Sequence, residues 1–228
     1  MIFDQIHETL KETAVPCPEY VIGNHFGSNA KMSLYDHANF FCFREGKTLQ
    51  ADIENYMINY KKGIDPISRQ AVSKQRQFIK PEFFKVINRN YLSKIKYDNG
   101  NSLINRHKGF LYVAGDGSDF ELPDFLEVRE EFGIINTPKY TKPCMGKFSA
   151  LMDVTNGFLL DGIIGNYKEG ELPLMHLNLK NIENMINSEK TIFIFDRNYG
   201  AMELYARIIE MNSYFGIVKS VMWSKFLE

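Results

Sequence analysis

Two aspartates that each follow an apolar run are the residues best suited to chemistry. Asp116 comes after Leu-Tyr-Val-Ala-Gly, and Asp196 comes after Thr-Ile-Phe-Ile-Phe. Such runs are typical of buried strands, and ligands of open α/β sheets gather at strand ends. Two carboxylates that meet there are suited to hold Mg²⁺ or Mn²⁺, and paired ions of this kind promote displacement at phosphorus. The alternative is structural, because Asp after a strand also caps helices and turns.

The elements that would position these aspartates form an α/β pattern from Phe110 onward. Asn156-Gly157 between two apolar runs predicts a tight hairpin. The order strand, hairpin, helix, strand, helix, strand predicts a mixed sheet with flanking helices. The expected strands are 110–114, 148–154, 158–164, 191–195 and 214–218, with helices near 179–186 and 202–209.

A basic helical region precedes this pattern. Residues 61–96 contain ten Lys and Arg but two acids, although the whole chain has a net charge of −1. Ser68 is a suitable cap for one short helix, and Pro81 is a suitable start for the next. Short basic helices with a tight turn favour contact with double-stranded DNA, and the alternative is an ordinary helical bundle with a solvated basic face. The residues expected to reach phosphates are Arg69, Lys74, Arg76 and Lys80.

The patterns divide the chain into four segments. Residues 1–50 have no clear period and indicate no function, and residues 51–96 are the basic helical region. Residues 97–109 are polar and rich in Asn, which is typical of a linker. Residues 110–228 are the predicted α/β domain.

Composition excludes several classes of protein. The three cysteines are far apart and form no Cys-x-x-Cys pair, so we expect neither a zinc cluster nor a disulfide framework. There is no uninterrupted apolar run of about 18 residues, so no membrane span is expected. The first twenty residues lack the apolar core of a secretory signal. We therefore expect a cytoplasmic protein.

Several motifs, in this order and spacing, resemble those of insertion-sequence DDE transposases. Gly-Asp-Gly-Ser at 115–118, followed by Phe-Glu-Leu-Pro at 120–123, resembles the first-Asp motif. Phe-Asp-Arg-Asn-Tyr-Gly at 195–200 is similar to the second-Asp motif, although Asn198 stands where Gly is usual. Residues 149–157 resemble the hairpin between the two motifs, and 214–220 resemble the strand that follows. Upstream, residues 68–76 and Pro-Glu-Phe at 81–83 resemble the DNA-binding helices of the same family.

The resemblance implies an RNase-H-like catalytic core and a role for each matching residue. Asp116 would bridge the metal ions, and Asp196 would ligate one of them. Arg197 and Tyr199 would lie beside the scissile DNA, and Lys219 would contact phosphate. The implied reaction is Mg²⁺- or Mn²⁺-dependent cleavage at transposon ends, followed by strand transfer to target DNA. The implied setting is a homodimer on DNA in the bacterial cytoplasm, associated with the nucleoid.

One part of the family pattern is missing. The third metal ligand of these transposases is a Glu on a helix beyond the last matched strand, in a Tyr-Arg-x-x-Glu type of motif. Only 221–228 follow Ser220, and they hold no such motif. Glu228 follows the strand too closely to fold back to the site. The resemblance therefore predicts a truncated form that is inactive or weakly active.

Three other functions stay as alternatives. A transposase-derived chain with two carboxylates can act as a non-catalytic DNA-binding protein or an inhibitor of transposition. A metal-dependent nuclease or phosphatase can share the same order of elements. A structural or interaction domain is the third alternative, in which both aspartates are caps.

Overall fold

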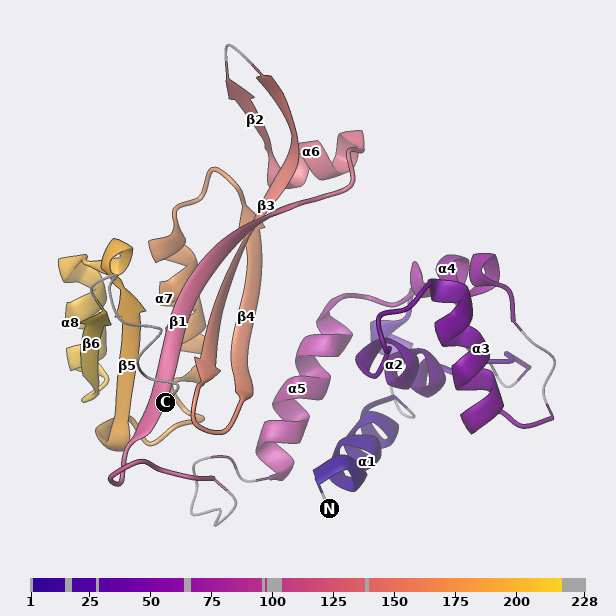
Figure 1. The fold of residues 1–228 in the computed structure, drawn as a ribbon, viewed down its shortest axis with the longest axis horizontal. Coiled ribbons are helices and arrows are strands. Elements are labelled where there is room, and N and C mark those ends of the chain that lie inside the picture. The colour runs from indigo at the N-terminus through magenta and orange to yellow at the C-terminus, as the bar shows by residue number, and fades with distance from the viewer. Residues whose placement is uncertain are drawn as a thin grey trace. The chain divides into compact units, whose positions relative to one another are not determined.

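A computed structural model describes residues 2–14, 18–27, 29–63, 67–95, 97, 104–137 and 140–218. The chain divides into two compact units, Met1–Lys94 and Ile95–Glu228. The first is built of helices with one isolated β-bridge, Val21↔Ile79, and the second is built on a sheet (Figure 1). We call them the helical unit and the sheet unit. None of the helices in the described ranges is long and apolar enough to cross a membrane.

Five α-helices form the helical unit, and local sequence fixes several of their ends. Ser33, Thr48 and Ser68 cap the starts of three helices, because each side-chain oxygen accepts a backbone N–H of the first turn. The predicted cap at Ser68 is therefore present. The helices are α1 (Ile2–Ala14), α2 (Leu34–Cys42), α3 (Leu49–Tyr60), α4 (Arg69–Arg76) and α5 (Glu82–Lys94), with a short 3-10 turn at Pro18–Tyr20.

The helical unit does not separate at residue 50, where the sequence suggested a boundary. One core cluster joins α1, α2 and α5 around Phe83, and another joins α2, α3 and α4 around Ile53. Helix α2 contributes buried side chains to both clusters. The described parts of residues 1–50 and 51–94 therefore pack into one compact unit.

The sheet unit has the predicted mixed sheet with flanking helices. Five strands lie in the order β4-β3-β1-β5-β6. The first three pair antiparallel, and β5 and β6 run parallel to β1. The expected hairpin joins β3 to β4. The strands are β1 (Leu111–Glu121), β3 (Tyr140–Asp153), β4 (Phe158–Asn166), β5 (Thr191–Asp196) and β6 (Tyr214–Val218).

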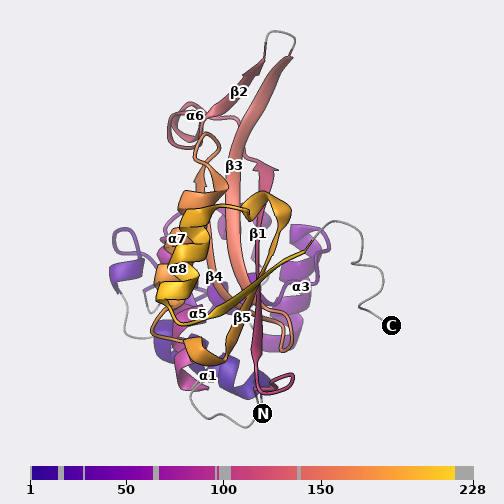
Figure 2. The ribbon, with the colours of Figure 1, turned by 90° about the vertical axis from the view of Figure 1, so that its left-hand side faces the viewer.

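Helices α7 (Glu171–Ile182) and α8 (Met202–Glu210) cover one face of the sheet (Figure 2). Burial alternates along β1 and β5, with every second side chain directed toward the helices. Gly115 belongs to this covered face, because a Cβ there would press against Met175 of α7. The intervening residues of β1, which include Asp116, point to the opposite face.

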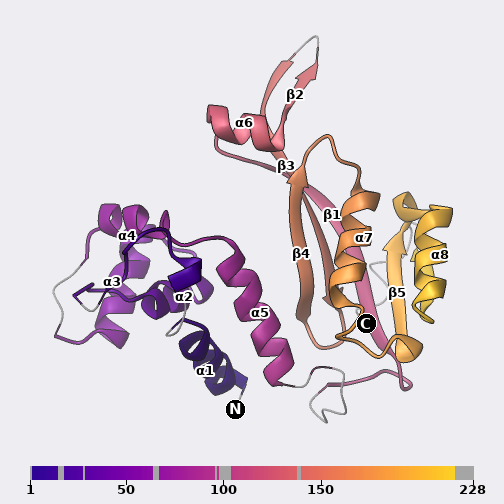
Figure 3. The same ribbon diagram turned by 180° about the vertical axis from the view of Figure 1, so that it is seen from behind.

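Strands β1 and β3 continue past the sheet into an extension that sequence analysis did not anticipate (Figure 3). It carries α6 (Leu126–Phe132) and β2 (Ile134–Thr137), which pairs with β3. The Gly-Asp-Gly-Ser segment resembles a turn in composition, but it lies inside β1, paired from Val113↔Asp153 to Glu121↔Met145. Long-range pairing with β3 overrides the local preference of these residues for turns.

Two described residues of the segment expected to be a linker, 97–109, are packed against the sheet unit. Tyr97 and Ile104 are buried. The Tyr97 hydroxyl donates a hydrogen bond to the fully buried Asp153 carboxylate at 2.7 Å. Asp153 also accepts the backbone N–H groups of Thr155 and Asn156 in the β3–β4 turn. Tyr97 is therefore a packed part of the sheet unit.

Candidate functional site

The pairing of β1 with β5 brings the two predicted aspartates together. The parallel register runs without a shift from Leu111↔Thr191 to Gly115↔Phe195, and the next position on each strand is Asp116 and Asp196. Neighbouring strands lie about 4.8 Å apart, and residues in register point to the same face. The two carboxylates therefore project side by side from adjacent strands.

Backbone groups hold one oxygen of each carboxylate. Asp116 Oδ1 accepts the N–H of Gly117 at 2.8 Å, and Asp196 Oδ1 accepts the N–H of Asn198 at 2.7 Å. Asp196 thereby caps the 3-10 turn Arg197–Tyr199, so the structural role considered from sequence is present at this residue. Asp116 is exposed and Asp196 is half-buried. Neither forms an ion pair with a cation of the described ranges, so the other oxygen of each is available to a ligand.

Glycines let the strands come close beneath the carboxylates. A Cβ on Gly115 would lie 2.8 Å from Phe195 Cδ1 and 3.0 Å from Met175 Cε. A Cβ on Gly117 would lie 3.0 Å from the Tyr199 hydroxyl. The Gly-Asp-Gly sequence thus places an exposed carboxylate between two positions where a side chain has no room.

Tyr199 is buried beneath the pair of carboxylates. Its side chain is 1% exposed, and its ring packs on Phe195 with centroids 5.5 Å apart. Burial raises the pKa of its hydroxyl, and the negative charges of Glu171 and Asp116 raise it further. In this structure Tyr199 packs beneath the turn that carries Asp196, and its predicted contact with DNA stays a prediction.

A lysine next to the site was missed by sequence reasoning. Lys147 of β3 lies 3.0 Å from Asp119 of β1 and 3.4 Å from Glu171 at the start of α7. Burial alone would lower the pKa of Lys147, but its hydrogen bonds and ion pairs with the two acids raise it. The contacts depend on the paired extension of β1 and β3, which no sequence pattern indicated. Lys147 therefore pairs with Asp119 and Glu171 and forms no ion pair with Asp116 or Asp196.

The donor set suits a small hard cation. Mg²⁺ prefers oxygen ligands and keeps several waters, so two carboxylates from the protein are sufficient to bind it. In the described ranges, no three His, Cys, Asp or Glu residues lie close enough together to hold a metal ion. The residues that fit Mg²⁺ or Mn²⁺ are therefore the pair Asp116 and Asp196, with the remaining positions left for water or substrate.

The lysines and arginines predicted to contact DNA lie on exposed surface where they are described. Arg69, Lys74 and Arg76 of α4 are exposed, and so is Arg197, next to Asp196. Lys80 is exposed as well, but its ammonium donates to the carbonyl of Glu19 at 2.6 Å. Lys219 lies outside the described residues.

Comparison with solved structures finds transposases at low similarity. A piggyBac transposase synaptic complex with hairpin DNA matches with a TM-score of 0.42 and 10% identity, over 98% of this chain and 49% of that chain. A Drosophila P element transposase strand transfer complex matches with a TM-score of 0.39 and 9% identity, over 94% and 47%. A Mos1 mariner paired end complex with Mn matches with a TM-score of 0.32 and 11% identity, over 96% and 68%.

The chain thus spans about half the length of the first two of these proteins. No family model matches the chain, and no curated protein matches it. At these TM-scores the similarities assign neither an activity nor a ligand to this chain.

Proposed function

We propose that this chain has the catalytic-core and DNA-binding parts of an insertion-sequence DDE transposase. The observation that carries the proposal is the β1–β5 register, which sets Asp116 beside Asp196 on one face of an RNase-H-like sheet. The transposase-like motifs around both residues support it.

In this proposal the two carboxylates hold Mg²⁺ or Mn²⁺. The bound cation would supply Lewis-acid stabilisation of charge at phosphorus. The backbone N–H groups of Gly117 and Asn198 fix the orientation of the carboxylates before any ion binds. Arg197 would attract a DNA phosphate to the same edge, and buried Tyr199 would keep the turn that carries Asp196 in place.

The exposed bases of α4 would bind the phosphates of double-stranded DNA. The side chains of Arg69, Lys74 and Arg76 form no ion pair with another described residue, so binding a phosphate would break no existing ion pair. Contacts of this kind give affinity and strong salt dependence but no choice of sequence. Two copies on one DNA, as the resemblance implies, are part of the same proposal.

The described ranges supply a pair of carboxylates and no triad. We therefore expect cation binding and DNA binding, with strand cleavage that is weak or absent. The same observation favours a second candidate, a non-catalytic DNA-binding protein that occupies transposon ends or inhibits transposition. In the first candidate Asp116 and Asp196 affect DNA binding and nicking through the cation, and in the second candidate they affect neither.

The test measures DNA binding and nicking with the full chain, with and without Mn²⁺. The transposase proposal expects Mn²⁺ to tighten binding of duplex DNA, with weak nicking of supercoiled plasmid. Asp116→Asn and Asp196→Asn should each remove the Mn²⁺ effect. Asp119→Asn is the matched control, because Asp119 lies on the same strand but pairs with Lys147.

Each outcome separates the candidates. DNA binding that Mn²⁺ does not change, with no nicking by the wild type, would favour the non-catalytic protein. Absence of DNA binding would overturn both. Strong Mg²⁺-dependent cleavage would show that another residue completes the metal site, and the expectation of weak activity would then be wrong.

A further inference from the structure

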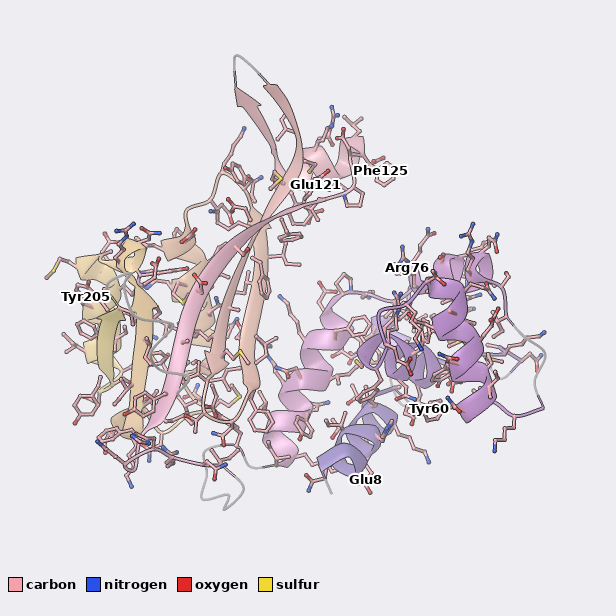
Figure 4. All side chains as sticks on the ribbon, viewed as in Figure 1. Glu8, Tyr60, Arg76, Glu121, Phe125 and Tyr205 are labelled. Carbon is pink, nitrogen blue, oxygen red and sulfur yellow. The ribbon has the colours of Figure 1, made fainter. Side chains whose placement is uncertain are left out.

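The helical unit has a cavity with no role in the chemistry described above. It lies where α4 ends and the chain turns toward α5, and its volume is about 390 Å³. Figure 4 marks Arg76 at the end of α4. The residues around the cavity are Phe41, Arg76, Gln77, Ile79 and Phe84, and we call this site the Phe84 notch.

The floor of the Phe84 notch is apolar and partly aromatic. Ile79 is buried in the core of the helical unit, and Phe41 is half-buried. The Phe84 side chain is 37% exposed, although it stands next to the fully buried Phe83. An exposed ring on an apolar floor provides a surface on which another flat ring can stack.

The other side of the notch is polar, and its two side chains have no hydrogen-bond partner among the described residues. Arg76 and Gln77 are both exposed, and neither side chain has a hydrogen bond or ion pair to a described residue. The guanidinium only donates hydrogen bonds, whereas the amide of Gln77 both donates and accepts. A ligand that matches this polar side has an anionic group for Arg76 and a polar edge for Gln77.

The charge around the notch points to the same class of ligand. Lys74 and Lys85 are exposed nearby in sequence, and Glu82 is the one acid between residues 67 and 95. A flat ring with a polar edge and an attached anion describes a nucleotide. In an intact duplex the faces of each base are covered by its neighbours, so a ring can stack on Phe84 only when the base is unpaired.

We propose that the Phe84 notch binds one unpaired base of DNA, stacked on Phe84, with its edge at Gln77 and its phosphate at Arg76. This deepens the proposed function and rests on DNA binding by the helical unit. It gives that unit a preference for DNA whose strands are locally separated, as at an opened end.

The test compares two DNAs with the full chain by fluorescence anisotropy. One is a perfect duplex, and the other is the same duplex with one unpaired nucleotide. Stacking of one base on one aromatic ring is expected to tighten binding about tenfold. An abasic site at the unpaired position should remove this preference, because the backbone is kept and the ring is lost.

Variants assign the effect to the notch. Phe84→Ala should bind the duplex within about twofold of the wild type and lose the preference for the unpaired base. Lys85→Gln is the matched control on the same helix, and it should weaken both DNAs equally. Circular dichroism of both variants shows whether each is folded, and Gln77→Ala gives a second substitution, at an exposed residue, that should reduce the preference.

The failure of this inference differs from the failure of the proposed function. Equal binding of both DNAs by the wild type, or a preference that survives Phe84→Ala and Gln77→Ala, would overturn the notch assignment while DNA binding stands. Absence of binding to either DNA would overturn both. Free deoxyadenosine monophosphate that competes as well as the unpaired DNA would show a nucleotide site, and a DNA site would then be excluded.

Discussion

Replacement of Gly115 by Ala should damage the sheet directly under the carboxylate pair. The new Cβ would lie 2.8 Å from Phe195 Cδ1 and 3.0 Å from Met175 Cε, and closer still to Phe195 Cε1. Neither neighbour can swing away into solvent, because Phe195 is 1% exposed and Met175 is 0% exposed. The strands must therefore separate or the ring must leave its position.

The magnitude follows from the cost of overpacking a closed core. Forcing an extra carbon into a well-packed interior typically costs about 1–3 kcal/mol. We expect the upper part of this range, about 2–3 kcal/mol, because backbone on β1 and a ring on β5 are both constrained. The displacement falls next to Asp116 and Asp196, so Mn²⁺ affinity should decline as well.

The assay is urea unfolding of the full chain, together with hydrogen exchange of the β1 and β5 amides. The matched control is Gly216→Ala on β6 of the same sheet, where a Cβ would meet nothing within 4 Å. This control should change the free energy of unfolding by no more than about 0.5 kcal/mol. Equal effects of Gly115→Ala and Gly216→Ala would refute the close approach of β1 and β5.

Other predictions concern buried polar groups. Tyr97→Phe should destabilise the sheet unit by about 1.5–3 kcal/mol in urea unfolding, because the buried Asp153 carboxylate loses a donor; a loss below about 0.5 kcal/mol would contradict this. Burial lowers the pKa of His37 below 6.5, so its stabilising contribution is complete above that pH and is lost as the pH falls. His37→Asn should therefore flatten the decline in melting temperature between about pH 7 and pH 5.5, and an unchanged decline would exclude His37 as the cause. Burial by itself raises the pKa of Asp36, but hydrogen bonds from Lys61 and Ser33 lower it below 3.8. The stability that ionised Asp36 contributes is therefore lost as the pH falls through that region. Lys61→Met should make this loss of stability in acid smaller.

The fold of the sheet unit was largely predictable because its strands are apolar and nearly uninterrupted. The runs before Asp116 and Asp196 indicate buried strands by composition alone. The Asn156-Gly157 turn indicates the hairpin by its backbone preference. Asp116 and Asp196 each follow a run of five strand residues. Because β1 and β5 pair without a shift, the two aspartates come to lie side by side.

The extension of β1 was not predictable in the same way. Asp116 and Gly117 favour turns locally, and their strand conformation comes from pairing with a distant part of β3. Lys147 was missed for the same reason, because its contacts with Asp119 and Glu171 require that pairing.

The sequence did not predict that Tyr199 is buried. A Tyr after Asp-Arg-Asn suits an exposed DNA contact and a packed ring equally well, and the three-dimensional contact with Phe195 decides between them. Helix α2 buries side chains in two clusters instead of one, so its apolar residues do not follow a single narrow stripe.

The most direct measurement is a Mn²⁺ titration of the full chain followed by electron paramagnetic resonance. If Asp116 and Asp196 share an ion, each single Asn variant should lose about tenfold or more in affinity, and the double variant should lose little beyond that. Asp119→Asn should bind as the wild type does. Wild-type affinity in either single variant, or losses that simply add in the double variant, would contradict a shared site.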